Sequence, residues 1–487
     1  MKHQIKKRND PNQADHKMRR HLKRHNITKH FKMMKFIFPI LMMLIMTAVT
    51  IGVLNTVLYG ADVETLEVIG RNIFVGLFLL LLFVYMYIFK PHILFDKKHM
   101  LMLTIIYLIV IIPSQFLANT SFIWLLPYTL LGMIIALLID EGLGVLANLV
   151  VTIIIVITGN LDISFMLFFI ISGSISPVLT SMAKERQKMF YVALYMMAIN
   201  GALLVFKSIL GSSNGFEILT ENMIYVLLNP ALAVIVTYGS LPLFETIFNL
   251  LTPFKLLELT NTNHKLLQRL LLEAPGTYHH SQMVANLAEK AAMDIGANPL
   301  LARSGALFHD IGKMKHPFNF TENQNANNPN DQLAPDTSAE IIINHVSDGV
   351  KLAKDHKLPK EIIDIIREHQ GDAIVYYFYH KAKEHSDGFV IDPGKFKYNG
   401  PKPQSNEAAI VMIADCVEAA IKAQSPSDRT MEKITEVIRE IIKIKILDYQ
   451  LVESKLMLKE LVIIEKAFIK VYNGMYHERI KYPEVIV

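Results

Sequence analysis

The stretch FHDIGK, Phe308 to Lys313, places a histidine and an aspartate side by side in an otherwise apolar segment. Burying an imidazole beside a carboxylate is costly unless a metal ion or a counter-charge uses both groups. The pair therefore indicates a metal ion or a counter-charge nearby, and a metal site would require further histidines and carboxylates elsewhere in the same domain.

The composition indicates a membrane protein with a second, water-soluble part. Of the 487 residues 52% are hydrophobic, and the mean hydropathy is +0.32. The chain is thus too apolar for one soluble domain, but long enough for a membrane region and a cytosolic domain. Its single cysteine, Cys416, excludes an intramolecular disulfide framework and a cysteine zinc site, so we expect a small core residue there.

Residues 1–35 form a basic tail. They contain 12 Lys/Arg and two acidic residues, a net charge of +10 in a chain whose total is +5. Such a tail could bind nucleic acid or anionic lipid headgroups. The positive-inside rule favours a disordered cytoplasmic arm instead. We therefore expect the lipid bilayer as a partner, and no nucleic acid polymer.

Residues 36–250 are predicted to form a multi-span membrane domain. Eight apolar runs approach the roughly 20 residues that cross a bilayer, at 36–58, 72–89, 100–117, 122–139, 143–158, 161–181, 189–210 and 222–248. The basic residues of the short loops lie on the side of the tail, whereas the other side is mostly acidic. An even number of spans then places both termini in the cytoplasm of a bacterial cell. The runs contain no charge pattern that indicates an ion relay, so a transporter is not favoured.

Residues 254–487 are predicted to form a cytosolic, all-helical domain. Apolar residues recur at helical spacing in segments such as EIIDIIREHQ and KITEVIREIIKIKILDYQLVE, and period-two alternation is scarce. The polar segment 319–336 should be a loop. The amphipathic helices after Asp415 could serve as core or as a homodimer contact, and core is favoured.

Four histidines and two aspartates in this domain are candidate metal ligands. They are His280 in TYHHSQMVANL, His309 and Asp310 in FHDIGK, His345 in IINHVSDGV, His369 in REHQG and Asp415 in IVMIADCVEAA. A mixed set of nitrogen and oxygen ligands suits divalent ions such as Mn²⁺, Fe²⁺ or Co²⁺. Six ligands would suit two ions bridged by one carboxylate.

The order of these residues resembles the HD-domain metallophosphohydrolases. The phrases EAPGTYHHSQMVANLAEKAA, ENQNANNPND, GVKLAKDHKLP, YYFYHKAKE and GPKPQSNEAAIVMIADCVEAA are similar to one branch of that superfamily, the membrane-anchored HD phosphodiesterases of the PgpH type, which cleave cyclic di-AMP. The resemblance covers residues 254–475, and the preceding membrane segment also fits this family.

The resemblance implies a role for each of these residues. His280 and His309 would be terminal ligands of one ion, Asp310 the bridging carboxylate, His345 and His369 ligands of a second ion, and Asp415 the closing ligand. Lys313 would face the phosphate and, with Asp310, contribute to catalysis. Of the adjacent pair, His280 and not His279 should point to the metal.

The implied activity is hydrolysis of cyclic di-AMP to the linear dinucleotide pApA. Two Mn²⁺ or Fe²⁺ ions would supply a hydroxide and neutralise charge on the phosphate. The aromatic run 376–379 could stack on adenine, although at least two of its rings should be core.

The sequence departs from the family at two places. Only about a dozen residues separate the first two apolar runs, where relatives carry a large extracellular domain, and Asn330 stands where a histidine is expected.

Several alternatives stay open. They are an HD hydrolase of cyclic di-GMP or guanosine tetraphosphate, and a membrane receptor whose HD domain only binds nucleotide. The sequence after His369 lacks the Gly-Tyr-Pro that a cyclic di-GMP enzyme would carry.

Overall fold

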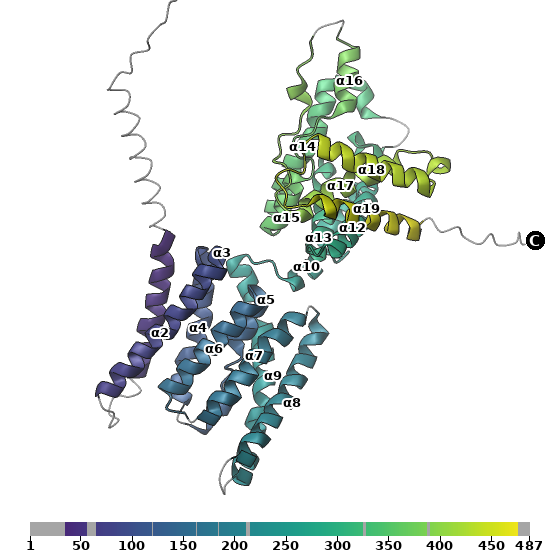
Figure 1. Ribbon diagram of the computed structural model, residues 1–487. Coiled ribbons are helices and arrows are strands. Elements are labelled where there is room, and N and C mark those ends of the chain that lie inside the picture. The colour runs from purple at the N-terminus through teal and green to yellow at the C-terminus, as the bar shows by residue number, and fades with distance from the viewer. Residues whose placement is uncertain are drawn as a thin grey trace, which may run out of the picture. The chain divides into compact units, whose positions relative to one another are not determined.

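The computed structural model describes residues 35–55, 65–118, 120–161, 163–183, 185–210, 215–324, 328–386 and 390–475. The predicted basic tail, apart from Lys35, lies outside the described residues, as does the connection 56–64. The chain divides after Thr252 into two compact units (Figure 1). The described residues form helices and no strand, with one isolated bridge between Ile374 and Lys397. The predicted all-α fold class is thereby confirmed.

The first unit is a bundle of long apolar helices. In chain order it contains Lys35–Asn55, α2 (Thr65–Phe89), α3 (Pro91–Leu94), α4 (Lys97–Leu117), the 3-10 helix η1 (Ser121–Leu125), α5 (Leu130–Leu138), α6 (Glu141–Thr158), α7 (Ile163–Met182), α8 (Arg186–Leu210) and α9 (Gly215–Phe248). Seven of the described helices are long and apolar enough to cross a membrane. Asp96 and Asp140 begin α4 and α6, because each carboxylate accepts a backbone N–H of the first turn. The seven long apolar helices thus indicate a membrane protein.

The segment predicted as a span at 122–139 differs from the other seven. It consists of η1 and the nine-residue α5, separated by a non-helical stretch around Pro127. Hydropathy measures only how apolar a segment is, and proline lacks the N–H that a continuous helix needs. The segment therefore runs through the unit without forming one long helix.

Contacts at the two ends of the bundle show that this segment does traverse it. Lys90, just after α2, bonds Asp140, just before α6, at 2.7 Å. At the opposite ends of the same two helices, Arg71 donates to the Thr158 carbonyl at 3.0 Å. Since α4 leads away from Lys90, the chain must return through 121–138 to reach Asp140. Among the described residues, the segment 121–138 therefore runs between the same two ends of the bundle as α2 and α6.

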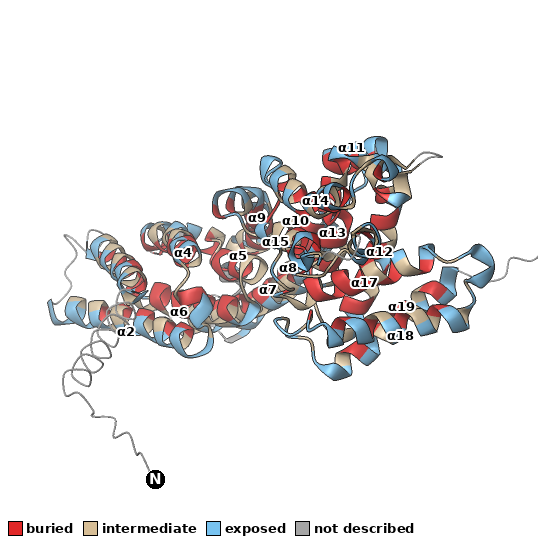
Figure 2. Ribbon diagram, turned by 90° about the horizontal axis from the view of Figure 1, so that it is seen from above, coloured by how far each residue is buried: buried red, intermediate tan, exposed pale blue. Residues whose placement is uncertain are grey.

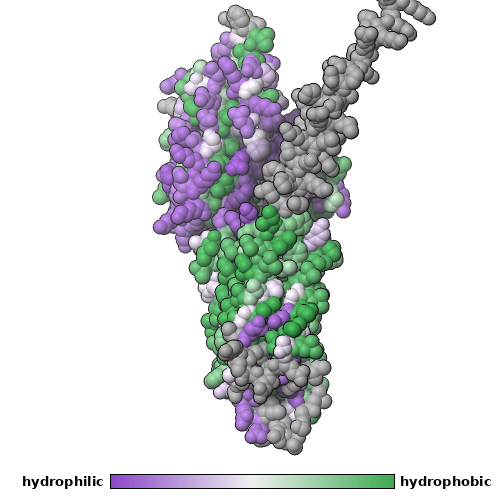
Figure 3. Space-filling view, turned by 90° about the vertical axis from the view of Figure 1, so that its left-hand side faces the viewer, coloured by the Kyte–Doolittle hydropathy of each residue, from purple (hydrophilic) through white to green (hydrophobic). Residues whose placement is uncertain are grey.

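The surface of this unit is hydrophobic, as a lipid-facing surface must be. Figure 3 shows hydrophobic side chains gathered over the helical bundle, and hydrophilic ones covering the second unit. Exposed residues such as Leu66, Ile73 and Ile235 contribute to the apolar surface.

The second unit is a compact helical domain. Its helices are α10 (Pro253–Leu259), α11 (Lys265–Glu273), α12 (Pro275–Ile295), α13 (Pro299–Phe308), α14 (Pro335–Asp355), α15 (Lys360–Glu368), α16 (Tyr376–Glu384), α17 (Asn406–Lys422), α18 (Met431–Leu447) and α19 (Leu458–Met475). Short 3-10 helices connect them: η2 (Ile311–Lys315), η3 (Pro317–Asn319), η4 (Thr321–Asn323), η5 (Pro329–Gln332), η6 (Pro393–Phe396) and η7 (Pro426–Asp428). Figure 2 shows buried residues concentrated along α13 and α17 at the centre of this unit.

Two features of the sequence position these helices. Asn298 and Ser405 cap α13 and α17 by accepting a backbone N–H three residues later. Gly312 allows the turn after α13 to lie directly on α14, because a Cβ at this position would sit 1.9 Å from the carbonyl oxygen of His345. Gly312 thus brings the His-Asp pair of FHDIGK close to His345 on α14.

Candidate metal centre

The six candidate ligands converge from five helices. His280 lies in α12, His309 and Asp310 follow α13, His345 lies in α14, His369 follows α15 and Asp415 lies in α17. Each is at most 7% exposed. Their side-chain atoms form two groups, one of His280, His309, Asp310 and Asp415 and one of Asp310, His345 and His369. Asp310 belongs to both groups.

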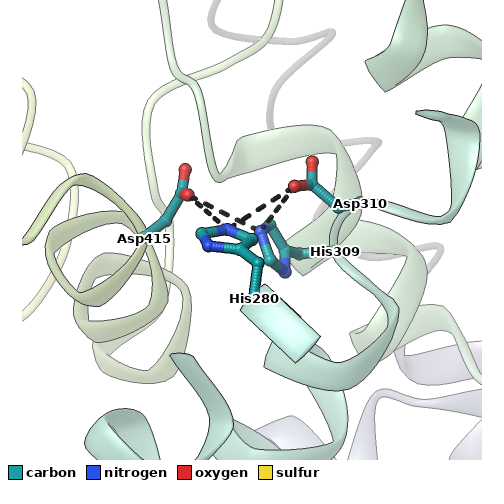
Figure 4. Close-up of side chains that lie close together, drawn as sticks. All are labelled: His280, His309, Asp310 and Asp415. Atoms are coloured by element: carbon teal, nitrogen blue, oxygen red, sulfur yellow. Dashed lines mark hydrogen bonds and ion pairs between the residues drawn. The ribbon is translucent and has the colours of Figure 1, made fainter. Parts of the chain in front are cut away.

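The first group places two imidazoles between two carboxylates (Figure 4). His280 Nε2 lies 3.0 Å from Asp415 Oδ1 and 3.6 Å from Asp310 Oδ2. His309 Nε2 lies 3.2 Å from Asp310 Oδ2 and 3.7 Å from Asp415 Oδ1. All four ligand atoms therefore face one small volume.

The second group uses the other oxygen of Asp310. His345 Nε2 and His369 Nε2 lie 3.3 and 3.6 Å from Asp310 Oδ1, and 3.2 Å from each other. Each oxygen of one carboxylate thus faces its own pair of histidines, which is the arrangement that a bridging ligand requires.

Every imidazole uses Nδ1 to fix its orientation. The acceptors are the carbonyls of Ala306 for His309 (2.7 Å), Ile342 for His345 (2.5 Å) and Ile366 for His369 (2.8 Å), and the Glu418 carboxylate for His280. A carbonyl can only accept, so Nδ1 carries the proton and Nε2 is the atom left to coordinate.

The charge balance of the site calls for cations. Burial disfavours a protonated imidazole, yet the hydrogen bonds that His280 donates to the Asp415 and Glu418 carboxylates raise the pKa of His280 to about 9. Burial also opposes ionisation of Asp310, but His309 and Lys313 hold the pKa of that carboxyl well below its usual range. Burial lowers the pKa of His369 to about 4, so this imidazole is neutral. The buried carboxylates therefore keep protons on neighbouring groups, which a metal ion would displace.

Several buried ligand atoms of this cluster form no hydrogen bond, although Asp310 Oδ2 has an ion-pair contact with Lys313. His309 Nε2 and both oxygens of Asp310 form no hydrogen bond of good geometry with the described residues. Buried polar atoms without hydrogen bonds are rare in proteins, and such atoms suit an ion or a water molecule as their partner. Together with the nitrogen and oxygen donors, they fit a divalent metal ion, and the cluster indicates divalent metal binding.

Lys313 lies inside the site in an ion pair. Its ammonium is 2.6 Å from Asp310 Oδ2 and 2.9 Å from Glu322 Oε1. A direct contact with phosphate stays a prediction.

Two other sequence predictions have clear positions. His280 is buried and His279 is exposed, and metal binding by His280 stays a prediction. Asn330 stabilises its loop through two hydrogen bonds of 2.8 Å. Its side-chain amide donates to the Asn319 carbonyl and accepts from the Asn319 side chain.

The aromatic run 376–379 splits as its helical phase requires. Phe378 is buried against Ala339 and Phe396, with Tyr379 beside it, while Tyr376 and Tyr377 are exposed. Two rings are therefore available at the surface of α16, and stacking on a base stays a prediction.

Three residues that contact the candidate ligands or Lys313 were not predicted from the sequence. Glu418 holds His280, Glu322 binds Lys313, and Gln370 donates to Asp415 Oδ2 at 3.0 Å. Glu418 lies one helical turn after Asp415 and could have been found by that spacing. Gln370 directly follows His369, but nothing in the local pattern identifies Glu322.

Two family models match the chain. One, described as a 7TM receptor with intracellular HD hydrolase, matches residues 65–252, and the HD domain matches residues 277–420.

The curated relatives agree with these matches. The cyclic-di-AMP phosphodiesterase PgpH of Listeria monocytogenes is 38% identical over 80% of this chain and 54% of that protein. PgpH of Bacillus subtilis is 38% identical over 85% of this chain and 60% of that protein. The chain therefore spans little more than half the length of these relatives.

A solved structure is also similar in sequence. The HD domain of L. monocytogenes PgpH in complex with cyclic-di-AMP is 47% identical, and the match covers 45% of this chain and 100% of that one, with a TM-score of 0.43. The chain belongs to the family of 7TM receptors with an intracellular HD hydrolase domain.

Proposed function

We propose that this chain is a membrane-anchored, metal-dependent phosphodiesterase that hydrolyses cyclic di-AMP to pApA. The observation that carries the proposal is the pair of ligand groups joined by Asp310. The substrate is inferred from the two relatives that are named as cyclic-di-AMP phosphodiesterases.

The proposal assigns the ligands by group. His280, His309 and Asp415 would hold one ion, His345 and His369 a second, and Asp310 both. Mn²⁺ or Fe²⁺ is proposed because the set mixes imidazole with carboxylate. Ions bound there would supply a hydroxide nucleophile at neutral pH and neutralise charge on the phosphodiester.

The protein residues then act by holding and orienting. The Nδ1 hydrogen bonds lock the four imidazoles, and Gln370 fixes the outer oxygen of Asp415. Lys313 is proposed to place a positive charge beside the phosphate, which favours an anionic transition state. The described residues supply no serine or cysteine within the ligand set, in keeping with direct attack by water.

We also propose the orientation in the membrane. The basic residues Lys90, Lys97 and Lys98 lie near one end of the bundle, and positive loops face the cytoplasm. Seven long helices together with the segment 121–138 would make eight passes, which would return the chain to that end after α9. Both termini and the HD domain would then be cytoplasmic, where a signalling nucleotide is available.

The test is hydrolysis by the full chain in detergent, loaded with Mn²⁺ or Fe²⁺. Cyclic di-AMP, cyclic di-GMP and guanosine tetraphosphate are offered in parallel, and light scattering of the same sample decides whether a homodimer forms. The proposal expects conversion of cyclic di-AMP to pApA and little turnover of the other two. Tight binding of cyclic di-AMP without hydrolysis would instead favour the receptor, and preference for another nucleotide would contradict the substrate.

A further inference from the structure

Lys313 is shared between two carboxylates in a nearly closed site. Its side chain is 13% exposed, and that of Glu322 is 14% exposed. The ammonium lies 2.6 Å from Asp310 Oδ2 and 2.9 Å from Glu322 Oε1. One lysine therefore connects the candidate metal ligand Asp310 to a carboxylate outside the ligand set.

The contact between Lys313 and Asp310 competes with metal binding. Asp310 Oδ2 is the oxygen that faces His309 Nε2 at 3.2 Å. A divalent ion bound by this group would need the oxygen that the ammonium contacts, and two cations close together repel each other. Lys313 must therefore have a second acceptor within reach if Asp310 is to serve both ligand groups.

Glu322 is built into the fold as that acceptor. Its Oε1 also accepts a hydrogen bond from Thr277 Oγ1 at 3.0 Å. The next residue, Asn323, accepts from the Thr277 N–H at 3.1 Å and donates to Thr277 Oγ1 at 2.8 Å. These bonds attach η4 to the first turn of α12, the helix that carries His280.

The backbone reinforces this attachment. A Cβ at Gly276 would lie 1.8 Å from the carbonyl oxygen of Glu322, so only glycine allows the two segments to meet. The Phe320 ring lies below the ammonium, with its centroid 5.0 Å from Lys313 Nζ. Glu322 therefore keeps a fixed place relative to the site.

We propose that Glu322 is a positioning residue that holds the Lys313 ammonium when a divalent ion takes Asp310 Oδ2. The pair leaves Asp310 free to join the two ligand groups and keeps the lysine inside the site. This inference rests on the proposed metal-dependent function, and it assigns a purpose to the phrase FTEN, residues 320–323, which lies outside the ligand set.

A double-mutant cycle on metal affinity tests the inference without an activity assay. Mn²⁺ is titrated calorimetrically into the metal-free full chain in detergent. Glu322→Gln should weaken Mn²⁺ binding by about tenfold, because residues that support ligands typically contribute 10- to 100-fold. Lys313→Met should tighten binding, since the competing ammonium is gone. In the Lys313→Met background, Glu322→Gln should cost less than about threefold, because only its distant charge is lost.

The chain offers a matched control on the same 3-10 helix. Lys315 bonds Asp348 at 2.9 Å, but its side chain is 59% exposed and contacts no candidate ligand. Asp348→Asn should leave Mn²⁺ affinity unchanged. Thr277→Val removes one donor to Glu322 but no charge, and should weaken binding by about threefold by the same supporting effect. If circular dichroism shows that Glu322→Gln does not fold, Thr277→Val is the variant that tests the role of Glu322.

The outcomes separate this inference from the proposed function. An equal loss of affinity from Glu322→Gln in both backgrounds, or no loss at all, would overturn the role of Glu322. A wild-type chain that binds Mn²⁺ but hydrolyses no cyclic di-AMP would overturn the proposed function, while the cycle would still decide the role of Glu322. A chain that binds no Mn²⁺ would overturn both.

Discussion

The two units of this molecule use buried polar side chains in opposite ways. In the membrane unit, Thr50, Thr104 and Thr158 donate to carbonyls four residues earlier in their own helices, at 2.8, 2.8 and 2.6 Å. In the HD unit, three of the four imidazoles of the site bond a carbonyl three residues earlier, and the fourth bonds the Glu418 carboxylate. Each turns its other nitrogen toward a shared carboxylate. A polar group whose partner lies in its own helix is structural, whereas converging groups with spare coordination predict a ligand.

The membrane unit also contains buried atoms without partners, and they sharpen the comparison. Asn148 Nδ2 and Thr152 Oγ1 in α6 have no partner among the described residues. Both are neutral, however, and they face Gly173 of α7, where helices pack closely. The buried cation Arg71 is paired with Glu67 and the Thr158 carbonyl. Charge and convergence, more than a missing hydrogen bond alone, therefore distinguish the metal centre.

The largest effect should come from removing the shared charge of the metal centre with Asp310→Asn. The amide keeps the volume but leaves both ligand groups without their common anion. Hydrolysis of cyclic di-AMP should fall by about 10³-fold or more, since an uncompensated buried charge costs about 3–5 kcal/mol. The assay is product formation by the full chain with Mn²⁺. Asp348→Asn, on the surface of α14, should retain wild-type turnover, and full activity of Asp310→Asn would refute the site.

The second largest effect should come from adding a methyl group at Gly312, where two backbone segments of the HD unit are in contact. Gly312→Ala would place a Cβ 1.9 Å from the His345 carbonyl, and overpacking of this kind costs about 1–3 kcal/mol or more. The matched change Gly239→Ala in α9 meets nothing within 4 Å and should be neutral or stabilising by about 0.5–1 kcal/mol.

The single tryptophan allows unfolding of the membrane unit to be measured separately from unfolding of the HD unit. Trp124 lies in the membrane unit, so its fluorescence reports unfolding of that unit alone. Gly312→Ala should lower the melting temperature seen by circular dichroism without moving the fluorescence transition. A shift of the Trp124 transition instead would contradict the assignment of this strain to the HD unit.

Removing the carboxylate that holds His280 should have a smaller effect, on the affinity for Mn²⁺. Its three counterparts are held by backbone carbonyls, which mutation cannot remove, but His280 depends on the Glu418 side chain. Glu418→Gln should weaken Mn²⁺ binding by about 10- to 100-fold, as loss of a ligand's supporting partner typically does. Excess Mn²⁺ should restore turnover in this variant. Glu440→Gln, an exposed residue of α18, provides the control, and an unchanged affinity in Glu418→Gln would show that His280 needs no such partner.

The candidate ligands could be identified from the sequence as residues of one cluster, because several of them interrupt apolar helices. His309, Asp310 and Asp415 occupy positions where burial is expensive, and helical spacing alone separates His280 from His279. Glu322 could not be predicted, because its role depends on Gly276 bringing two segments together that are far apart in sequence.

The membrane unit shows the same limit. Hydropathy identified the segment 122–139 but could not distinguish a continuous helix from a 3-10 helix followed by a short α-helix. That difference depends on the conformation around Pro127, and hence on packing against the neighbouring helices.

The smallest effect should come from a polar contact within the membrane unit, Tyr107→Phe. Tyr107 Oη lies 2.7 Å from Thr50 Oγ1, and Thr50 already donates to the Met46 carbonyl at 2.8 Å. Thr50 therefore keeps a partner when the tyrosine hydroxyl is lost. Interhelical hydrogen bonds in membrane proteins average about 0.6 kcal/mol, so the Trp124 transition should shift only slightly. The exposed Tyr195→Phe is the control. A loss above about 2 kcal/mol would exceed what such bonds contribute in membranes, and would show that this unit also relies on converging polar groups.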